Sequence, residues 1–343
     1  MTNEIIIKLK LAYSSRPWLR RLVKKVSNSP PYFWFARLKI KGQAKKDFQG
    51  PFNLVLETSN FCPARCLMCP HSLMKRQKGV MDNAVFSKIV ERVKRENLPI
   101  NKVFFSGLGE PLTDPDIIYR IEIFKQLGFS VRIYTNAFLL TEQISRQLVT
   151  LEVDEINISF NGTNPEQYRE IMGLDFQIAK NDIEKLIQIR TEAKSRKPAI
   201  QISSVLIREN EKDISQHLKN WQSKVESVTV SLAHQWGGGV SKIFNFQFSI
   251  FNSKKVYPCR SLWHTFMIDW QGNFVICCRD YESKFILGNI STHSFSEIRK
   301  SPILDSFRQA HLKFSEQKLP QICRQCNFPY QDGVEWFTPR SSD

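Results

Sequence analysis

Three cysteines lie close together in the first quarter of the chain. Cys62, Cys66 and Cys69 have the spacing C-x3-C-x2-C, and no fourth cysteine follows nearby. Cysteine thiolates hold iron–sulfur clusters, and a cubane of four irons needs four ligands. Three protein ligands would leave one iron open, whereas a structural zinc site normally closes with four. The spacing therefore predicts a cluster with a vacancy. The alternatives are three unrelated structural thiols or a zinc knuckle completed by His71.

The elements that must position these cysteines follow from the hydrophobic pattern, which alternates between short apolar runs and helical periods from residue 53 onward. The expected strands are 54–57, 102–106, 130–134, 155–160, 200–206 and 227–232. The expected helices are 82–95, 114–127, 141–148, 166–172, 179–193 and 211–221. Six β/α units in a row predict a parallel sheet with helices outside it.

Six units are too few for a closed eight-unit barrel, so the pattern fits an open barrel or a doubly wound sheet. In both architectures ligands bind at the C-terminal ends of the strands, where the three cysteines begin. Gly237–Gly239 then interrupts the pattern like a linker. Extended segments follow at 242–252, 265–269 and 273–277, with a hairpin turn at Gln271-Gly272. We expect an extension at 1–52, a core at 53–239 and a second domain at 240–343.

The strand ends carry small and polar residues that suit a ligand. Gly109 and Glu110 follow the second strand, Asn136 the third, and Ser159 and Asn161 the fourth. Small residues there let the backbone approach a ligand, and a carboxylate can pair with an ammonium group. Turn chemistry is the structural alternative, since Asn, Ser and Gly are ordinary loop starters.

Together, the cysteine triplet and these strand ends resemble the radical S-adenosylmethionine (radical SAM) enzymes. Glu110 falls on that family's Gly-Gly-Glu-Pro motif, with Leu108 in place of the first glycine. Asn161 stands where Asp is more usual, and Met68 where an aromatic often precedes the third cysteine. The resemblance implies a partial (β/α)6 TIM-type barrel. It also implies a [4Fe–4S] cluster whose open iron binds S-adenosyl-L-methionine, which is cleaved to a 5′-deoxyadenosyl radical that takes hydrogen from substrate.

By the same resemblance, Gly109 and Glu110 bind the amino group of the cofactor's methionine part. Asn136, Ser159 and Asn161 bind its ribose or carboxylate. A flavodoxin- or ferredoxin-type protein would supply the electron. The radical chemistry belongs to the cofactor, and the protein binds, orients and shields it.

The remaining cysteines resemble the twitch domain, a short form of the SPASM extension of radical SAM enzymes. The resemblance implies one auxiliary [4Fe–4S] cluster, closed by four ligands and serving as an electron relay. These ligands are Cys259, Cys277, Cys323 and Cys326. Cys278 is left over, as a buried thiol or as the ligand in place of Cys277. A zinc ribbon with four cysteine ligands is the competing interpretation.

Composition bounds the setting of the protein. The 343 residues are 42% hydrophobic and show neither a long apolar run nor the features of a signal peptide. Eight cysteines without an export signal indicate a reducing compartment, so we expect a cytoplasmic protein.

The net charge of +16 is concentrated at the N-terminus. Residues 1–50 hold twelve Lys or Arg and two acids, a net +10, mixed with six Trp, Tyr or Phe. This composition suits an anionic membrane surface, which would make the protein peripheral to the membrane. It would also suit nucleic acid, although nucleic acid does not explain the strand-end motifs. A solvated, partly helical extension that covers the barrel is the structural alternative.

The sequence thus predicts an oxidoreductase acting on a small molecule or a peptide. The favoured reaction is a two-electron oxidation of a sugar- or cyclitol-like alcohol, because twitch-domain relatives of that kind match the cysteine layout best. The alternatives are a peptide-modifying maturase, an epimerase with Cys278 as hydrogen donor, and a non-catalytic metal-bearing nucleic-acid-binding protein. The candidates to position substrate or move a proton flank the auxiliary ligands: Arg260, Arg279, Asp280, Asp332 and Glu335.

Overall fold

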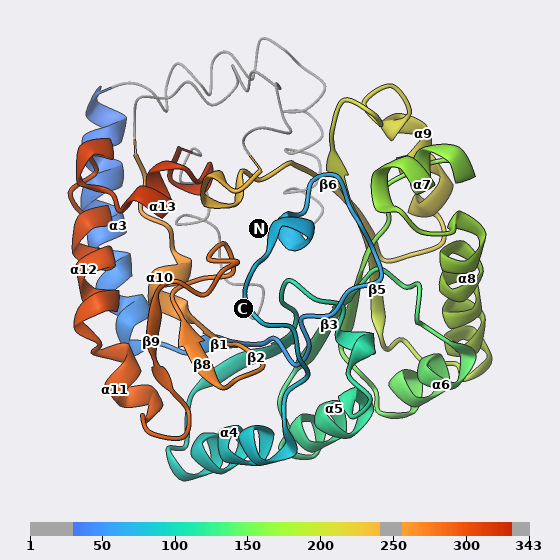
Figure 1. Cartoon of the computed structure of the whole chain (residues 1–343), viewed down its shortest axis with the longest axis horizontal. Helices are drawn as coiled ribbons and strands as arrows, with labels where there is room; N and C mark the ends of the chain where they lie inside the picture. Colours follow the sequence, from blue (N-terminus) through green and yellow to red (C-terminus); the bar gives the residue numbers. More distant parts are fainter. Residues whose placement is uncertain (1–29, 241–255, 331–343) are drawn as a thin grey trace.

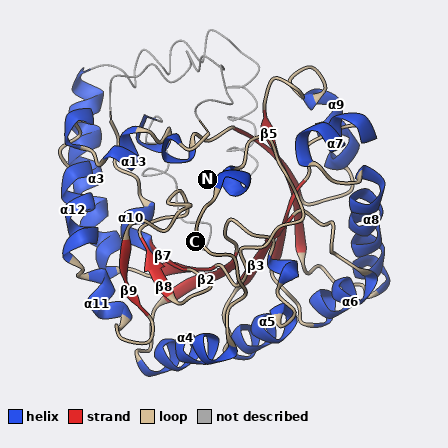
Figure 2. Ribbon diagram, in the orientation of Figure 1, coloured by secondary structure: helices blue, strands red, loops and turns tan. Residues whose placement is uncertain are grey.

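The computed structural model describes residues 30–240 and 256–330, which share one nine-stranded sheet. The strand order is β6-β5-β4-β3-β2-β1-β7-β8-β9, and Figure 2 shows the sheet curving around the centre of the molecule. The strands are β1 (Phe52–Leu56), β2 (Ile100–Phe105), β3 (Val131–Thr135), β4 (Glu155–Ser159), β5 (Ala199–Leu206), β6 (Ser227–Leu232), β7 (Thr265–Ile268), β8 (Asn273–Val275) and β9 (Ile286–Asn289).

The first six strands run parallel, each paired with the next in sequence. Their helices lie around the outside of the curve (Figure 1). They are α4 (Asn83–Arg95), α5 (Ile117–Gln126), α6 (Glu142–Thr150), α7 (Pro165–Met172), α8 (Phe176–Glu192) and α9 (Ile214–Gln222). The partial (β/α)6 barrel is therefore confirmed, and every expected strand and helix of this part is present within a few residues of its expected bounds.

Helix α4 shows how local sequence signals specify a helix of the barrel. The Asp82 side chain accepts the backbone N–H of Ala84 and begins the helix, as an N-cap should. Phe86, Ile89 and Val93 are buried along one face, at the three- and four-residue spacing that packs a helix on a sheet. Most of the apolar side chains of these β/α units join one large core cluster.

The C-terminal part continues the same sheet. Strand β7 pairs in parallel with β1, and β8 is antiparallel to both of its neighbours, β7 and β9. The expected hairpin turn is present, and Gly272 takes the positive φ of 82° that this turn requires. The helices here are α10 (Ser261–His264), α11 (Phe295–Arg299), α12 (Pro302–His311) and α13 (Gln321–Arg324). The extended segment expected at 242–252 lies outside the described residues.

The described part of the basic extension is a helix, α3 (Pro30–Gln49), that packs on this C-terminal part. Ala36, Ile40 and Ala44 are buried in a second core cluster with side chains of α10 and α12. Figure 1 shows α3 beside α12. Asp47 and Arg260 form a buried ion pair, with Oδ2 and Nε 2.7 Å apart. The described part of the extension thus packs on the C-terminal part, rather than on the barrel as the structural alternative had it.

Among the described residues, no helix combines the length and the apolar character that crossing a membrane requires.

Candidate functional site

The three thiols of the triplet open onto one cavity at the C-terminal ends of the strands. Its volume is about 240 Å³. All the residues that the sequence predicts to bind cluster or cofactor here line this cavity: Cys62, Cys66, Cys69, Gly109, Glu110, Asn136, Ser159 and Asn161. They come from the ends of three strands, β2, β3 and β4, and from the loop after β1, so the fold brings together what the sequence separates by about one hundred residues.

Each thiol of the triplet is held in a poorly solvated environment. Burial raises the pKa of Cys62 to about 12 and raises the pKa values of Cys66 and Cys69. The neighbouring thiols add to the effect at Cys62 and Cys66, because nearby negative charges repel one another. Metal binding requires thiolates and therefore expels these protons. Three buried thiolates side by side are unfavourable unless a positive charge lies between them, so this donor set fits the positively charged core of an iron–sulfur cluster.

Glu110 is the buried carboxylate of the cavity, with 2% of its surface exposed. It accepts hydrogen bonds from the Thr135 hydroxyl at 2.7 Å, the Asn136 N–H at 2.7 Å and the Leu112 N–H at 3.2 Å. Burial raises its pKa to about 7, against the opposing effect of these bonds. A carboxylate has about four lone-pair sites, so three bonds leave one for an ammonium group.

Both asparagines at the cavity also accept a backbone N–H, Asn136 from its own strand end and Asn161 from the neighbouring strand β5. The Asn136 Oδ1 accepts the N–H of Phe138 at 3.0 Å, and its Nδ2 lies 3.7 Å from Cys62 Sγ. The Asn161 Oδ1 accepts the N–H of Val205 at 2.6 Å. The turn chemistry weighed from the sequence is therefore real at Asn136, whereas Asn161 ties the end of β4 to β5, and both side chains still border the cavity.

Gly109 is required by close packing. A Cβ at this position would lie 2.5 Å from Asn60 Cα and still closer to the Ser59 carbonyl oxygen. The backbone of the second strand end can approach the loop before the cysteines only if this residue has no side chain.

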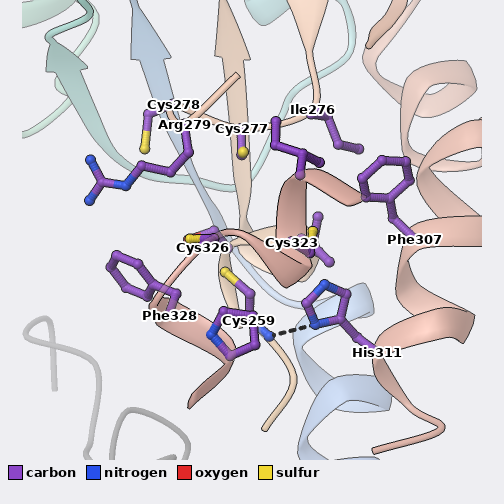
Figure 3. A pocket seen from close by; sticks show the side chains of 14 residues that line it. Cys259, Ile276, Cys277, Cys278, Arg279, Phe307, His311, Cys323, Cys326 and Phe328 are labelled. Carbon is purple, nitrogen blue, oxygen red and sulfur yellow. Dashed lines mark hydrogen bonds between the residues drawn. The ribbon is translucent and has the colours of Figure 1, made fainter. Parts of the chain in front are cut away.

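The second set of cysteines surrounds a smaller, mostly apolar pocket of about 50 Å³ (Figure 3). It is lined by Cys259, Cys277, Cys278, Cys323 and Cys326, together with apolar side chains such as Ile276 and Phe307. Burial raises the pKa values of Cys277, Cys323 and Cys326. Cys278 is exposed and so is not the buried thiol that was one alternative for it, whereas Cys277 is half-buried and its thiol interacts electrostatically with those of Cys278, Cys259 and Cys326.

Trp236, which the sequence gave no reason to select, joins the two pockets. Its Nε1–H donates to the Met68 carbonyl at 2.9 Å, within the cysteine triplet. The Arg279 guanidinium lies 4.6 Å from the centroid of its ring and 5.2 Å from that of Phe328. Trp236 lines the first pocket and Arg279 the second. A lone Trp beside a glycine run carries no readable signal before the fold is known.

The catalytic candidates have other roles where the structure describes them. Asp280 accepts the backbone N–H groups of Lys284 and Phe285, at 3.0 and 2.7 Å, and so orders a loop. Arg260 pairs with Asp47. Asp332 and Glu335 lie outside the described residues.

His71, the alternative zinc ligand, holds the Asn60 carbonyl through Nε2 at 2.9 Å. In residues 30–240 and 256–330, no three His, Cys, Asp or Glu side chains are arranged to hold a single metal ion. The thiols of each set instead border a shared pocket.

An open α/β barrel with three thiols at its strand ends, next to a second cysteine-lined pocket, defines a two-centre iron–sulfur protein. Comparison with known families agrees. The radical SAM superfamily profile matches residues 56–220, and an iron–sulfur cluster-binding domain, SPASM, matches residues 259–327. The chain belongs to the radical SAM superfamily and carries a C-terminal SPASM-type domain.

Two curated relatives are informative. A tungsten-containing aldehyde ferredoxin oxidoreductase cofactor-modifying protein of Pyrococcus furiosus is 31% identical over 163 residues, 47% of this chain and 45% of that protein. The S-adenosyl-L-methionine-dependent 2-deoxy-scyllo-inosamine dehydrogenase of Niallia circulans is 22% identical over 275 residues, 79% of this chain and 91% of that enzyme. The chain spans less than half the length of several of the curated relatives that it matches.

Solved structures share the fold. BtrN in complex with AdoMet and 2-DOIA aligns with a TM-score of 0.55 at 19% identity, over 81% of this chain and 93% of BtrN. Streptococcus suis SuiB bound to the precursor peptide SuiA aligns with a TM-score of 0.62 at 15% identity, over 79% of this chain and 70% of SuiB. Membership implies a [4Fe–4S] cluster and S-adenosyl-L-methionine, and the SPASM match implies auxiliary iron–sulfur.

Proposed function

We propose that this protein oxidises an alcohol carbon of a small polyol, such as a cyclitol or sugar, by two electrons. The observation that carries the proposal is the contrast between the two pockets. Three thiols face a cavity of about 240 Å³, whereas four thiols and Cys278 surround a pocket of about 50 Å³. The cavity at the triplet has room for a reacting molecule, whereas the auxiliary pocket is closed by its thiols and suits electron transfer. The dehydrogenase of Niallia circulans, aligned over 91% of its length, supports this choice.

In this proposal Cys62, Cys66 and Cys69 would hold the [4Fe–4S] cluster, which with S-adenosyl-L-methionine would supply the radical chemistry for hydrogen abstraction. Glu110 offers its remaining lone-pair site to the amino group of the methionine part, and Gly109 lets the strand end approach it. Asn136, Ser159 and Asn161 border the space for the ribose and carboxylate. Trp236 stands over the Met68 carbonyl and limits the access of water to the triplet.

Cys259, Cys277, Cys323 and Cys326 would hold the auxiliary cluster. The lower exposure of Cys277 favours it over the exposed Cys278. The electron count then balances. Oxidation to the ketone removes a hydrogen atom from the substrate carbon, a proton from the hydroxyl and one further electron, for which the auxiliary cluster would supply the acceptor.

We propose His234 as the base that takes the hydroxyl proton, because its ring lines the first cavity. Asn327 fixes the imidazole. Its Nδ2 donates to the Ala233 carbonyl at 3.2 Å, so its Oδ1 must face His234 Nδ1, 3.3 Å away. Nδ1 therefore carries the proton, and Nε2 keeps its lone pair. Burial is the main cause that lowers the pKa of His234 to about 4, and the positive charge of Arg279 adds to it, so the ring is neutral at pH 7.

The test is anaerobic reconstitution with iron and sulfide, followed by reductant and S-adenosyl-L-methionine. Release of 5′-deoxyadenosine that is lost in Cys66→Ala supports the class, and a colourless protein that holds only zinc would sink it. A panel of aminocyclitols and sugars then identifies substrate by ketone formation. His234→Gln should still release 5′-deoxyadenosine but form far less ketone. Full ketone formation by that variant would remove His234 from the proposal.

The alternatives predict different products from the same assay. A peptide-modifying maturase, as the likeness to peptide-bound SuiB would allow, leaves the alcohol panel unchanged. An epimerase inverts a carbon without net oxidation. Its proposed hydrogen donor, Cys278, lines the auxiliary pocket, whereas the lining of the first cavity does not include it. A nucleic-acid-binding protein would bind RNA or DNA in a salt-sensitive way and release no 5′-deoxyadenosine.

We further propose an anionic membrane surface as a partner of α3, which would place a cytoplasmic enzyme at the membrane periphery. Trp34, Phe35 and Leu38 are 64%, 56% and 52% exposed on the face opposite the buried Ala36 and Ile40. Exposed lysines continue that face toward the C-terminal end of the helix, namely Lys39, Lys41, Lys45 and Lys46. Exposed aromatic side chains favour the level of the headgroups, and exposed lysines are attracted to anionic lipids.

Vesicle sedimentation tests the membrane partner. Trp34→Ser with Phe35→Ser should abolish binding to vesicles that contain phosphatidylglycerol. Ile178→Ser, at a similarly exposed position on α8, should not. Equal binding by all variants, or binding that neutral phosphatidylcholine supports as well, contradicts the proposal. The electron donor is proposed to be a flavodoxin- or ferredoxin-type protein, and reduction by either in place of a chemical reductant tests it.

A further inference from the structure

His311 is a fully buried histidine that faces the auxiliary pocket. It is the last residue of α12, and none of its surface is exposed. Its ring lines the pocket together with the four proposed ligands, as Figure 3 shows from close by. The backbone N–H of Cys259 donates to His311 Nδ1 at 3.2 Å.

This contact fixes the tautomer of the ring. A backbone N–H can only donate, so Nδ1 must present its lone pair. The proton of the neutral imidazole is therefore on Nε2. Within the described ranges, Nε2 is buried and has no hydrogen-bond partner. A buried donor without an acceptor costs free energy, so such groups are rare unless something fills the site.

The surroundings of Nε2 define the acceptor it is missing. In Figure 3 this nitrogen points away from Cys259 N–H, toward the side of the pocket where Cys323 and Phe307 lie. The rest of the lining consists largely of cysteines and apolar side chains, including Ile276 and Leu262. A sulfur atom is the acceptor that this wall offers once the pocket is filled.

We propose that His311 Nε2–H donates an N–H···S hydrogen bond to a sulfur of the auxiliary cluster and raises its reduction potential. The inference rests on the auxiliary cluster of the proposed function. Reduction adds negative charge to the cluster, and much of it resides on the sulfurs. A hydrogen bond to a more negative acceptor is stronger, so the bond favours the reduced state. The apolar walls strengthen the effect, because a low local dielectric screens it poorly.

The consequence is functional. A cluster that is easier to reduce is a better acceptor for the electron that remains after hydrogen abstraction. His311 is in this sense a positioning and tuning residue for the auxiliary cluster, and it does not touch the substrate cavity, whose lining residues do not include it.

The test uses the full chain with Cys62, Cys66 and Cys69 replaced by Ala, so that only the auxiliary cluster remains. Its potential is measured by redox titration with electron paramagnetic resonance detection. Asn places an oxygen near the Nδ1 position, and Gln places an amide N–H near the Nε2 position. His311→Asn thus keeps the acceptor for Cys259 and loses the donor, whereas His311→Gln restores a donor.

In His311→Asn the ratio of reduced to oxidised cluster at a fixed potential should fall about tenfold, a shift of 59 mV for one electron. In His311→Gln it should stay within about twofold of the parent. Iron content serves as the control for an intact site. An intact cluster with the same potential in parent and His311→Asn would overturn the proposal.

A second measurement needs no substitution at His311. The parent, labelled with 15N-histidine, should show a histidine nitrogen and an exchangeable proton coupled to the reduced cluster in pulsed electron paramagnetic resonance. Absence of both couplings would also overturn the proposal. A parent that binds no iron after reconstitution refutes the auxiliary cluster itself. An iron-bearing cluster without these effects refutes only the role of His311.

Discussion

The sharpest structural prediction concerns Asp47, which ties α3 to the C-terminal part of the chain. Its carboxylate is fully buried and contacts Arg260 through two bonds, Nε at 2.7 Å and Nη2 at 3.4 Å. Arg260 is itself buried and follows Cys259, a proposed ligand of the auxiliary cluster. Removing the carboxylate leaves a guanidinium in a poorly solvated site. At the surface, water would solvate the remaining charge, and the loss of one partner would cost little stability.

The magnitude follows from that burial. Removing one partner of a buried ion pair costs about 3–5 kcal/mol. Total stabilities are about 5–15 kcal/mol, so Asp47→Ala should remove a large part of the free energy that holds α3 and its neighbours. Asp47→Asn keeps the volume and one acceptor and should cost less. The functional consequence is loss of iron from the auxiliary site, because the Cys259 loop loses its support.

The assay is urea unfolding of the apoprotein, followed by tryptophan fluorescence, with iron counted separately after reconstitution. Glu91→Ala is the matched control, since Glu91 lies in an exposed ion pair with Lys88 on α4. This control should leave the midpoint unchanged, because exposed pairs contribute little. Equal midpoints for Asp47→Ala and Glu91→Ala would refute the docking of α3 described above.

Three further predictions follow from other contacts. Gly109→Ala should abolish S-adenosyl-L-methionine cleavage, measured as 5′-deoxyadenosine release, because its Cβ would meet the backbone of Ser59 and Asn60. Gly42→Ala is the control: its Cβ would have nothing within 4 Å, so it should stabilise α3 by up to about 1 kcal/mol, measured as the urea midpoint. Trp236→Phe removes the donor to Met68 and about 1 kcal/mol, so a chelator should strip iron from the triplet roughly fivefold faster. Burial lowers the pKa of His217 in the folded protein, so the unfolded chain binds a proton on this residue more readily. The free energy of unfolding should therefore fall as pH drops below about 6.5. The decrease in unfolding midpoint from pH 7.5 to 5.5 should be smaller in His217→Gln than in the parent, and an equal decrease would contradict the assignment.

The barrel could be predicted because its signals are local. Asp82 begins α4, Gly128 follows α5 with a positive φ, and the spacing of Phe86, Ile89 and Val93 repeats along the helix. The site could be predicted for a related reason, since parallel strands place all their C-terminal ends at one edge. The domain limits and the individual ligand roles remain predictions.

The rest depended on contacts between distant segments. Helix α3 buries small residues such as Ala36 and Ala44 and exposes Trp34 and Phe35, so its sequence does not mark the buried face. The histidines at both pockets gave no signal, because a lone histidine becomes informative only when its hydrogen-bond partners are known. Asn327 and the N–H of Cys259 supply those partners from 93 and 52 residues away.

The pairing of β1 with β7 has a consequence for biosynthesis. Strand β1 precedes the cysteine triplet, and one of its edges is completed only by residues 265–268. At about 5–20 residues per second, a ribosome needs roughly 10–40 s to make the intervening chain. During that interval β1 has an unpaired edge, which is a site of mispairing between chains. The nascent barrel therefore stays incomplete beside its cluster loop until the C-terminal part emerges, which favours delivery of iron and sulfide after synthesis rather than during it.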